Sequence, residues 1–128
     1  MKKIEELFLP YELAVIAKEK GFDDWCFAVY TPEFKCVSHY GLGEEFTGMW
    51  KASETKGIPT PLHQEIIDWF IKKEIFINWE LQVTDVFEYY GTIHLVRDYN
   101  KVLHFKSDKK SDNYKALNEA IKEAFKLI

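Results

Sequence analysis

Two histidines and a glutamate on neighbouring predicted strands are the residues in this chain best suited to chemistry. His94 and His104 are predicted to face each other on the outer side of a sheet, with Glu80 diagonal to them and Asn78 adjacent. Imidazole and carboxylate groups are ligands that zinc prefers, and they also transfer protons. The pattern predicts a weak metal-binding or proton-transfer pair. The alternative is two histidines on a half-solvated sheet face, with no resident cofactor.

A second conceivable metal set contains two cysteines and two further histidines. Cys36 and His39 form a close pair, but Cys26 and His63 lie far from it and from each other in the sequence. Structural zinc sites are usually built from two close pairs, so both cysteines are interpreted as reduced, partly buried thiols. The sequence contains no nucleophile elbow, phosphate-binding glycine loop or recognisable triad. We therefore predict a protein that is not an enzyme.

One local cluster of lysines precedes and enters the last predicted helix. Asp108 and Asp112 are interleaved with it, and neither half of the chain is basic: residues 1–57 have seven Lys/Arg against ten Asp/Glu, and residues 58–128 have ten against eleven. Nucleic-acid binding requires clustered cations, because release of counterions supplies most of the non-specific affinity. Nucleic-acid contact is therefore the alternative, and a solvated helix entrance is preferred. The cluster consists of Lys106, Lys109, Lys110 and Lys115.

Aromatic residues make up 16% of the chain. Exposed rings can anchor a protein partner or stack on bases, because they offer rigid contact area. The alternative is that the N-terminal half covers them. The rings predicted to be buried are Trp69, Phe70, Trp79, Phe105, Tyr114 and Phe125. Those predicted to be exposed contacts are Trp50, Phe76, Tyr90 and Tyr99, with Tyr40, Phe46 and Phe87 also in or beside loops.

The elements that position these residues follow a helix, strand, strand, strand, helix order over residues 58–128. Thr60-Pro61 predicts the start of the first helix, and Ser111-Asp112 the start of the second. Between them, apolar and polar residues alternate from Ile75 to Val83, which is typical of a strand with one buried face. The predicted fold is α+β, with an antiparallel sheet backed by two helices.

Hydrophobic alternation also predicts the strand register. Leu95 is expected opposite Leu103 and Ile93 opposite Phe105, which leaves Asp98-Tyr99-Asn100 as a three-residue loop with Asn100 left-handed. The same register brings His94 opposite His104. Between the first two strands, the same reasoning predicts the pairs Val83 with Tyr89, Trp79 with Ile93 and Asn78 with His94.

The N-terminal half, residues 1–57, is predicted to add a helix and a β-hairpin. Residues 10–20 have helical periodicity and end at Gly21, a suitable helix-terminating residue. Apolar runs at residues 25–30 and 36–40 flank Thr31-Pro32-Glu33, which indicates a hairpin. The glycine-rich stretch 41–60 is interpreted as the loop that joins the two halves.

Length and composition predict one soluble, cytoplasmic domain of residues 1–128. The formal net charge is −4, and no apolar run approaches the ~20 residues of a membrane span. The charged N-terminal residues do not resemble a signal peptide. We expect a protein partner or self-association, and no membrane partner.

Residues 58–128 resemble the double-stranded-RNA-binding domain in the order and length of their elements and in Lys109-Lys110 before the last helix. The loop that enters the minor groove in that family corresponds here to residues 84–88, which are acidic and apolar. Gly91 and His94 match its Gly-Pro-x-His stretch loosely, without the proline. The resemblance implies the topology and, as an alternative function, nucleic-acid binding.

A second resemblance covers nearly the whole chain. The residues that carry it are Tyr11-Glu12, Ala14, 17–22, 59–61, 68–70, Tyr114, 116–117, 120–121, Ala124 and 127–128. In these residues the chain resembles a family of small uncharacterised proteins of phages, prophages and other mobile elements in Bacteroides-type gut bacteria. The resemblance implies a genomic setting and assigns no site residue. Together with the exposed rings, it predicts a small accessory protein acting through protein contacts.

Overall fold

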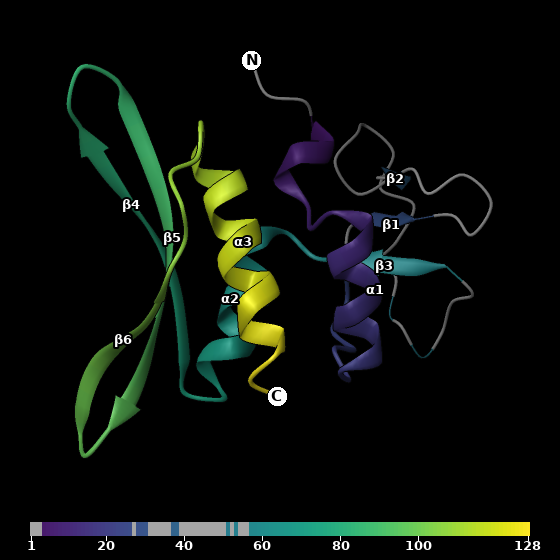
Figure 1. The fold of residues 1–128 in the computed structure, drawn as a ribbon. Helices are drawn as coiled ribbons and strands as arrows, with labels where there is room; N and C mark the ends of the chain where they lie inside the picture. Colours follow the sequence, from purple (N-terminus) through teal and green to yellow (C-terminus); the bar gives the residue numbers. More distant parts are fainter. Residues whose placement is uncertain (1–3, 27, 31–36, 39–50, 52, 54–56) are drawn as a thin grey trace. The chain divides into compact units, whose positions relative to one another are not determined.

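The computed structural model describes residues 4–26, 28–30, 37–38, 51, 53 and 57–128. The chain divides into two compact units, Met1–His63 and Gln64–Ile128. The boundary lies close to the division predicted after residue 57. Each unit has its own sheet and its own helices (Figure 1), so the two are described separately.

The first unit combines one α-helix with a small sheet. Its helix matches the predicted segment and buries Leu13, Ala14 and Ala17. The helix ends before Gly21, whose φ of +95° is a conformation that side chains with a Cβ rarely adopt. The described elements of this unit are η1 (Ile4–Leu7), α1 (Tyr11–Glu19), β1 (Ala28–Tyr30), β2 (Val37–Ser38) and β3 (Ile58–Thr60).

The sheet of the first unit has the strand order β2-β1-β3, and both pairs are antiparallel. The β1–β2 pair confirms the predicted hairpin, whose expected turn lies outside the described residues. The prediction of a loop up to Thr60 was wrong, because residues 58–60 form β3 on β1. A three-residue strand that contains Pro59 has no visible alternation, and proline is tolerated there because β3 is an edge strand.

Thr60 also differs from its predicted role as a helix cap. Its hydroxyl is buried and donates to the carbonyl of Leu9 at 2.7 Å, and the hydroxyl of Tyr30 donates to the same carbonyl at 2.8 Å. The helix that Thr60 was expected to cap begins instead at His63. A long-range hydrogen bond has taken the place of the local one.

The second unit confirms the predicted helix, strand, strand, strand, helix order and the α+β class. Its antiparallel sheet has the order β4-β5-β6, and both helices lie on one face of it (Figure 1). Asp112 caps the last helix as predicted, accepting from the N–H of Lys115 at 2.8 Å. No helix in the described part of the chain is long and apolar enough to span a membrane. The elements are α2 (His63–Ile71), β4 (Ile75–Val83), β5 (Phe87–Arg97), β6 (Asn100–Lys106) and α3 (Asn113–Phe125).

The core of the second unit lies between the centre of the sheet and the two helices. Phe70 from α2 and Phe125 from α3 are fully buried, with ring centroids 5.2 Å apart. Of the other rings predicted to be buried, Trp69, Phe105 and Tyr114 are half-buried. Trp79 corrects the prediction, because 37% of its surface is exposed.

The register between β4 and β5 differs from the prediction by two residues. Trp79 pairs with Gly91 and Ile77 with Ile93, while Val83 pairs with Phe87 across a turn at residues 84–86. The shift arises because the hairpin continues to a shorter loop than expected. Side chains alternate between the two faces with a period of two residues, so a shift of two residues leaves every side chain of this pair on its predicted face.

The register between β5 and β6 is partly confirmed. Ile93 pairs with Phe105 as predicted, but Leu95 pairs with Val102, because a β-bulge follows Ile93. The hairpin closes through two residues, Asp98 and Tyr99, with φ of +52° and +64°. A two-residue turn of this kind matches the twist of paired strands, and the bulge absorbs the additional residue.

Candidate functional site

The histidine pair expected on the outer sheet face does not form as predicted. His94 pairs with Leu103, because the bulge displaces His104 from the expected position. Glu80 pairs with Tyr90 and lies 3.6 Å from the ammonium of Lys106. Among the described residues, no group of three potential metal ligands comes together.

The second metal set is only partly within the described residues, because Cys36 and His39 lie outside them. Cys26 is buried, with its thiol 3.5 Å from the carbonyl of Asp24. His63 is also buried, and its Nδ1 lies 2.9 Å from the carbonyl of Leu7. Both side chains contact nearby backbone, which is a structural role.

Three of the four clustered lysines have a carboxylate partner within 4 Å. Lys106 lies 3.6 Å from Glu80, Lys109 lies 3.9 Å from Glu88, and Lys110 lies 3.9 Å from Glu119. Lys115 donates to the hydroxyl of Ser111 at 3.1 Å. Such surface pairs add little stability, but they reduce the positive potential available to a phosphate backbone.

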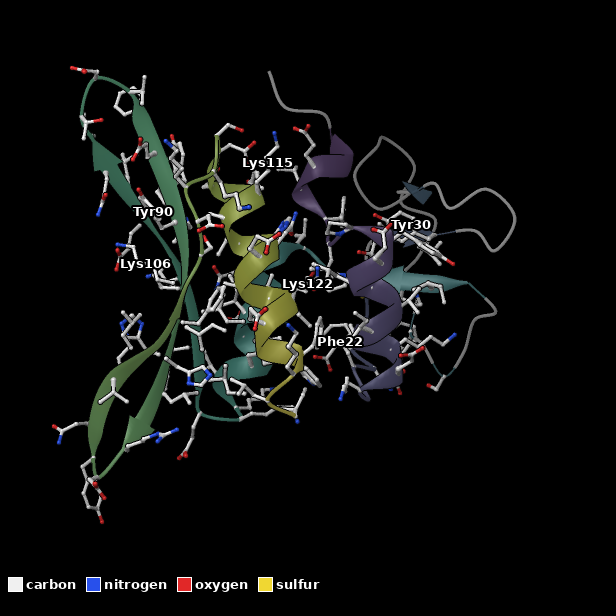
Figure 2. All side chains as sticks on the ribbon, in the orientation of Figure 1. Phe22, Tyr30, Tyr90, Lys106, Lys115 and Lys122 are labelled. Atoms are coloured by element: carbon white, nitrogen blue, oxygen red, sulfur yellow. The ribbon has the colours of Figure 1, made fainter. Side chains whose placement is uncertain are left out.

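The rings on the outer sheet face are covered by lysines. The ammonium of Lys106 lies 4.5 Å from the ring centroid of Tyr90, and that of Lys101 lies 5.3 Å from that of Phe76. Figure 2 shows Tyr90 and Lys106 on the side of the sheet away from α3. The hydroxyl of Tyr90 donates to Glu88 at 2.9 Å, and this hydrogen bond raises its pKa. The remaining rings of the predicted set are Tyr99, fully exposed at a hairpin tip, and Trp50, which with Tyr40 and Phe46 lies outside the described residues.

A cavity of about 400 Å³ runs beside β4. Gln64, Ile67 and Ile71 of α2 line one side, and residues 76–80 of β4 line another. Its charged groups include Glu80 and Lys101, which already lie beside Lys106 and Phe76. Asn78, Glu80 and His94 of the predicted histidine site also line this cavity, whereas His104 does not.

Among the described residues, several exposed apolar side chains lie together at the far end of the β4–β5 hairpin. We call residues 79–89 the arm. Alternation places five of its side chains on the face that also packs against the helices nearer the sheet centre. We call this surface the arm face. It consists of Trp79, Leu81, Val83, Phe87 and Tyr89, of which Trp79, Leu81, Val83 and Phe87 are 37%, 44%, 64% and 64% exposed.

Gly91 marks the place where the helix cover ends. A Cβ at this position would lie 1.9 Å from the backbone carbonyl oxygen of Ala116 and 3.1 Å from Cβ of Ala120. The first turns of α3 therefore touch the sheet directly at Gly91. Beyond it, the same face continues as the arm face and is solvent-exposed, and the hairpin projects past the start of α3 (Figure 1).

The arm face itself has no charged side chain. Glu80 and Glu88 alternate to the opposite face, and Asp85 lies in the turn with Val86, which is 60% exposed. The rings of Trp79 and Tyr89 lie 5.6 Å apart at the base of the arm. The arm face is thus an apolar, uncharged surface on a regular hairpin.

Sequence reasoning placed Phe87 in or beside a loop but missed the surface to which it belongs, although element lengths contain a signal for it. The 11 residues of β5 span about 36 Å, whereas the 13 residues of α3 cover about 20 Å. A helix of this length cannot cover such a strand.

Comparison of the chain with protein-family models, curated proteins and solved structures found no match.

Proposed function

We propose that this chain is a non-enzymatic protein-binding module that contacts its partner through the arm face. The observation that carries the proposal is the exposure of Leu81, Val83 and Phe87. These residues lie on the same face of the sheet as the buried core, but beyond the part that the helices cover. A contiguous apolar surface of this kind usually marks an interaction site, because leaving it in water is unfavourable.

The charge distribution favours a protein over a nucleic acid as the partner. Residues 75–96 contain Glu80, Asp85 and Glu88 and no lysine or arginine. Three of the lysines that follow, Lys106, Lys109 and Lys110, lie within 4 Å of carboxylates. A nucleic-acid surface would need uncompensated cations at this end of the sheet.

The hairpin holds the arm face in a preformed shape. Pairing of β4 with β5 continues to Val83 and Phe87, directly before the turn. Rigid side chains on a paired strand lose little conformational entropy when a partner binds, so more of the apolar burial contributes to affinity.

The resemblance to small proteins of phages and mobile elements supports an accessory role for this module, and we place that role in the cytoplasm. A cytoplasmic setting agrees with two cysteines that lack the spacing of a disulfide framework.

Site-specific photo-crosslinking in the native host would test the proposal. A photoreactive phenylalanine analogue at Phe87 should give covalent adducts with protein. The same analogue at Gln82 is the matched control, because this residue is also exposed but alternates to the opposite face of the arm.

Adducts formed at position 87 and not at position 82 would support the arm face as the contact surface. Absence of adducts at position 87, or equal yields at both positions, would contradict it. Crosslinks to nucleic acid at either position would favour the double-stranded-RNA-binding alternative.

A further inference from the structure

We propose that the partner of the arm face is a second copy of this chain, in a two-fold symmetric dimer in which the two arm faces pack together. This inference rests on the proposed function and names its partner. In such a dimer each copy presents the same surface, so the surface must be complementary to itself.

The absence of charge on the arm face meets this requirement. Two copies that pack through it bring Leu81, Val83 and Phe87 together without opposing like charges. Packing through the opposite face would instead remove Glu80 and Glu88, with their partners Lys106 and Lys109, from water, which is unfavourable for charged groups. A charged partner, in contrast, would find no group on the arm face with which to pair.

The exposed area of the arm face suits a weak, concentration-dependent dimer. The exposed parts of Trp79, Leu81, Val83 and Phe87 amount to roughly 400 Å² per copy, if each large side chain offers on the order of 200 Å². Two copies would bury about 800 Å² through these side chains, which is the size of a weak interface and not of an obligate one.

Face-to-face packing fits the arm better than addition of a strand to the edge of β4. The N–H of Trp79 donates to the side-chain oxygen of Asn78 at 2.9 Å, so the middle of this edge is occupied by a side chain. Such groups oppose pairing with another strand. The face of the arm has no comparable obstruction in the described residues.

Two-fold packing of the arms also predicts which groups meet. The outer end of one arm, with Val83 and Phe87, would lie over the base of the other, where the rings of Trp79 and Tyr89 are 5.6 Å apart. Sheets that pack in this way lie about 10 Å apart, which suits interdigitated side chains.

Sedimentation velocity of the purified full chain over a range of concentrations tests the dimer. The wild type should sediment as a dimer at high micromolar concentration, with little change when salt is raised. Phe87→Glu should be monomeric with unchanged circular dichroism. Gln82→Glu introduces the same charge on the opposite face, and it should dimerise like the wild type.

A wild type that stays monomeric at every concentration, or a dimer that Phe87→Glu does not disrupt, would overturn the dimer. The two proposals fail separately. A monomeric chain that still crosslinks to another protein through position 87 retains the proposed function and loses the dimer. A concentration-dependent dimer with no other adduct at position 87 supports the second copy as the partner.

Discussion

The centre of the β4-β5-β6 sheet and its arm have the same alternating pattern but opposite surroundings. At the centre, Ile77 and Ile93 are buried beneath two helices. In the arm, Val83 and Phe87 continue the same face and are exposed. The difference comes from the length of the cover and not from the strand sequence. We propose that the same hydrophobicity stabilises the fold at the centre of the sheet and serves recognition in the arm.

Truncating one phenylalanine in each region should show most clearly that the sheet centre stabilises the fold and the arm does not. Phe70→Ala empties a fully buried site that contacts Phe125, and it should lower the free energy of unfolding by about 3–5 kcal/mol. Phe87→Ala removes an exposed ring and should change it by less than about 0.5 kcal/mol in the monomer. Denaturant unfolding at low protein concentration measures both. Similar losses for the two variants would remove the distinction.

The border between the two regions should be intolerant of even one methyl group. Gly91→Ala places a Cβ against the carbonyl of Ala116, a backbone group that cannot rotate away. We expect a loss of about 3 kcal/mol, at the upper end of the range for overpacked sites. Thermal unfolding would detect it. A neutral Gly91→Ala variant would show that α3 does not rest on the sheet there.

The fold was more predictable from the sequence than the surface that we propose as functional. Alternation from Ile75 to Val83 and the cap at Asp112 are local signals, and both correspond to observed elements. Exposure of Trp79 is not local, because it depends on where α3, a helix distant in the sequence, begins. The histidine pair failed for a related reason. A bulge after Ile93 moves one strand by a residue, and hydrophobic alternation does not reveal a bulge.

The lysine cluster can be compared with the arm as a binding surface, and the expected effect is smaller. We expect binding to duplex RNA or DNA at physiological salt to be no better than non-specific. Lys109→Glu/Lys110→Glu should therefore leave fluorescence anisotropy of a labelled duplex unchanged, while dimerisation through the arm face also persists. Tight binding that weakens steeply with salt and is lost in this variant would favour the nucleic-acid function.

The smallest expected effect concerns Tyr90, on the outer face of the sheet next to the arm. The hydrogen bond to Glu88 raises the pKa of Tyr90 above its usual 10.0. Its stabilising contribution should be complete below that value and be lost as pH rises through the raised pKa of the folded state. The phenolate absorbance of the wild type minus that of Tyr90→Phe isolates this titration. In a Glu88→Gln background the midpoint should move to lower pH, and an unchanged midpoint would exclude Glu88 as the cause.

Accessibility of individual methyl groups tests most directly whether the arm face is a surface or a part of the core. In a monomeric sample, a soluble nitroxide should strongly broaden the methyl signals of Val83 and leave those of Ile93 sharp, because only the first residue is exposed. Addition of the partner, or an increase in protein concentration, should protect Val83. Equal protection of both residues in the dilute monomer would show that the arm face is buried within one chain, and would contradict its role as a binding surface.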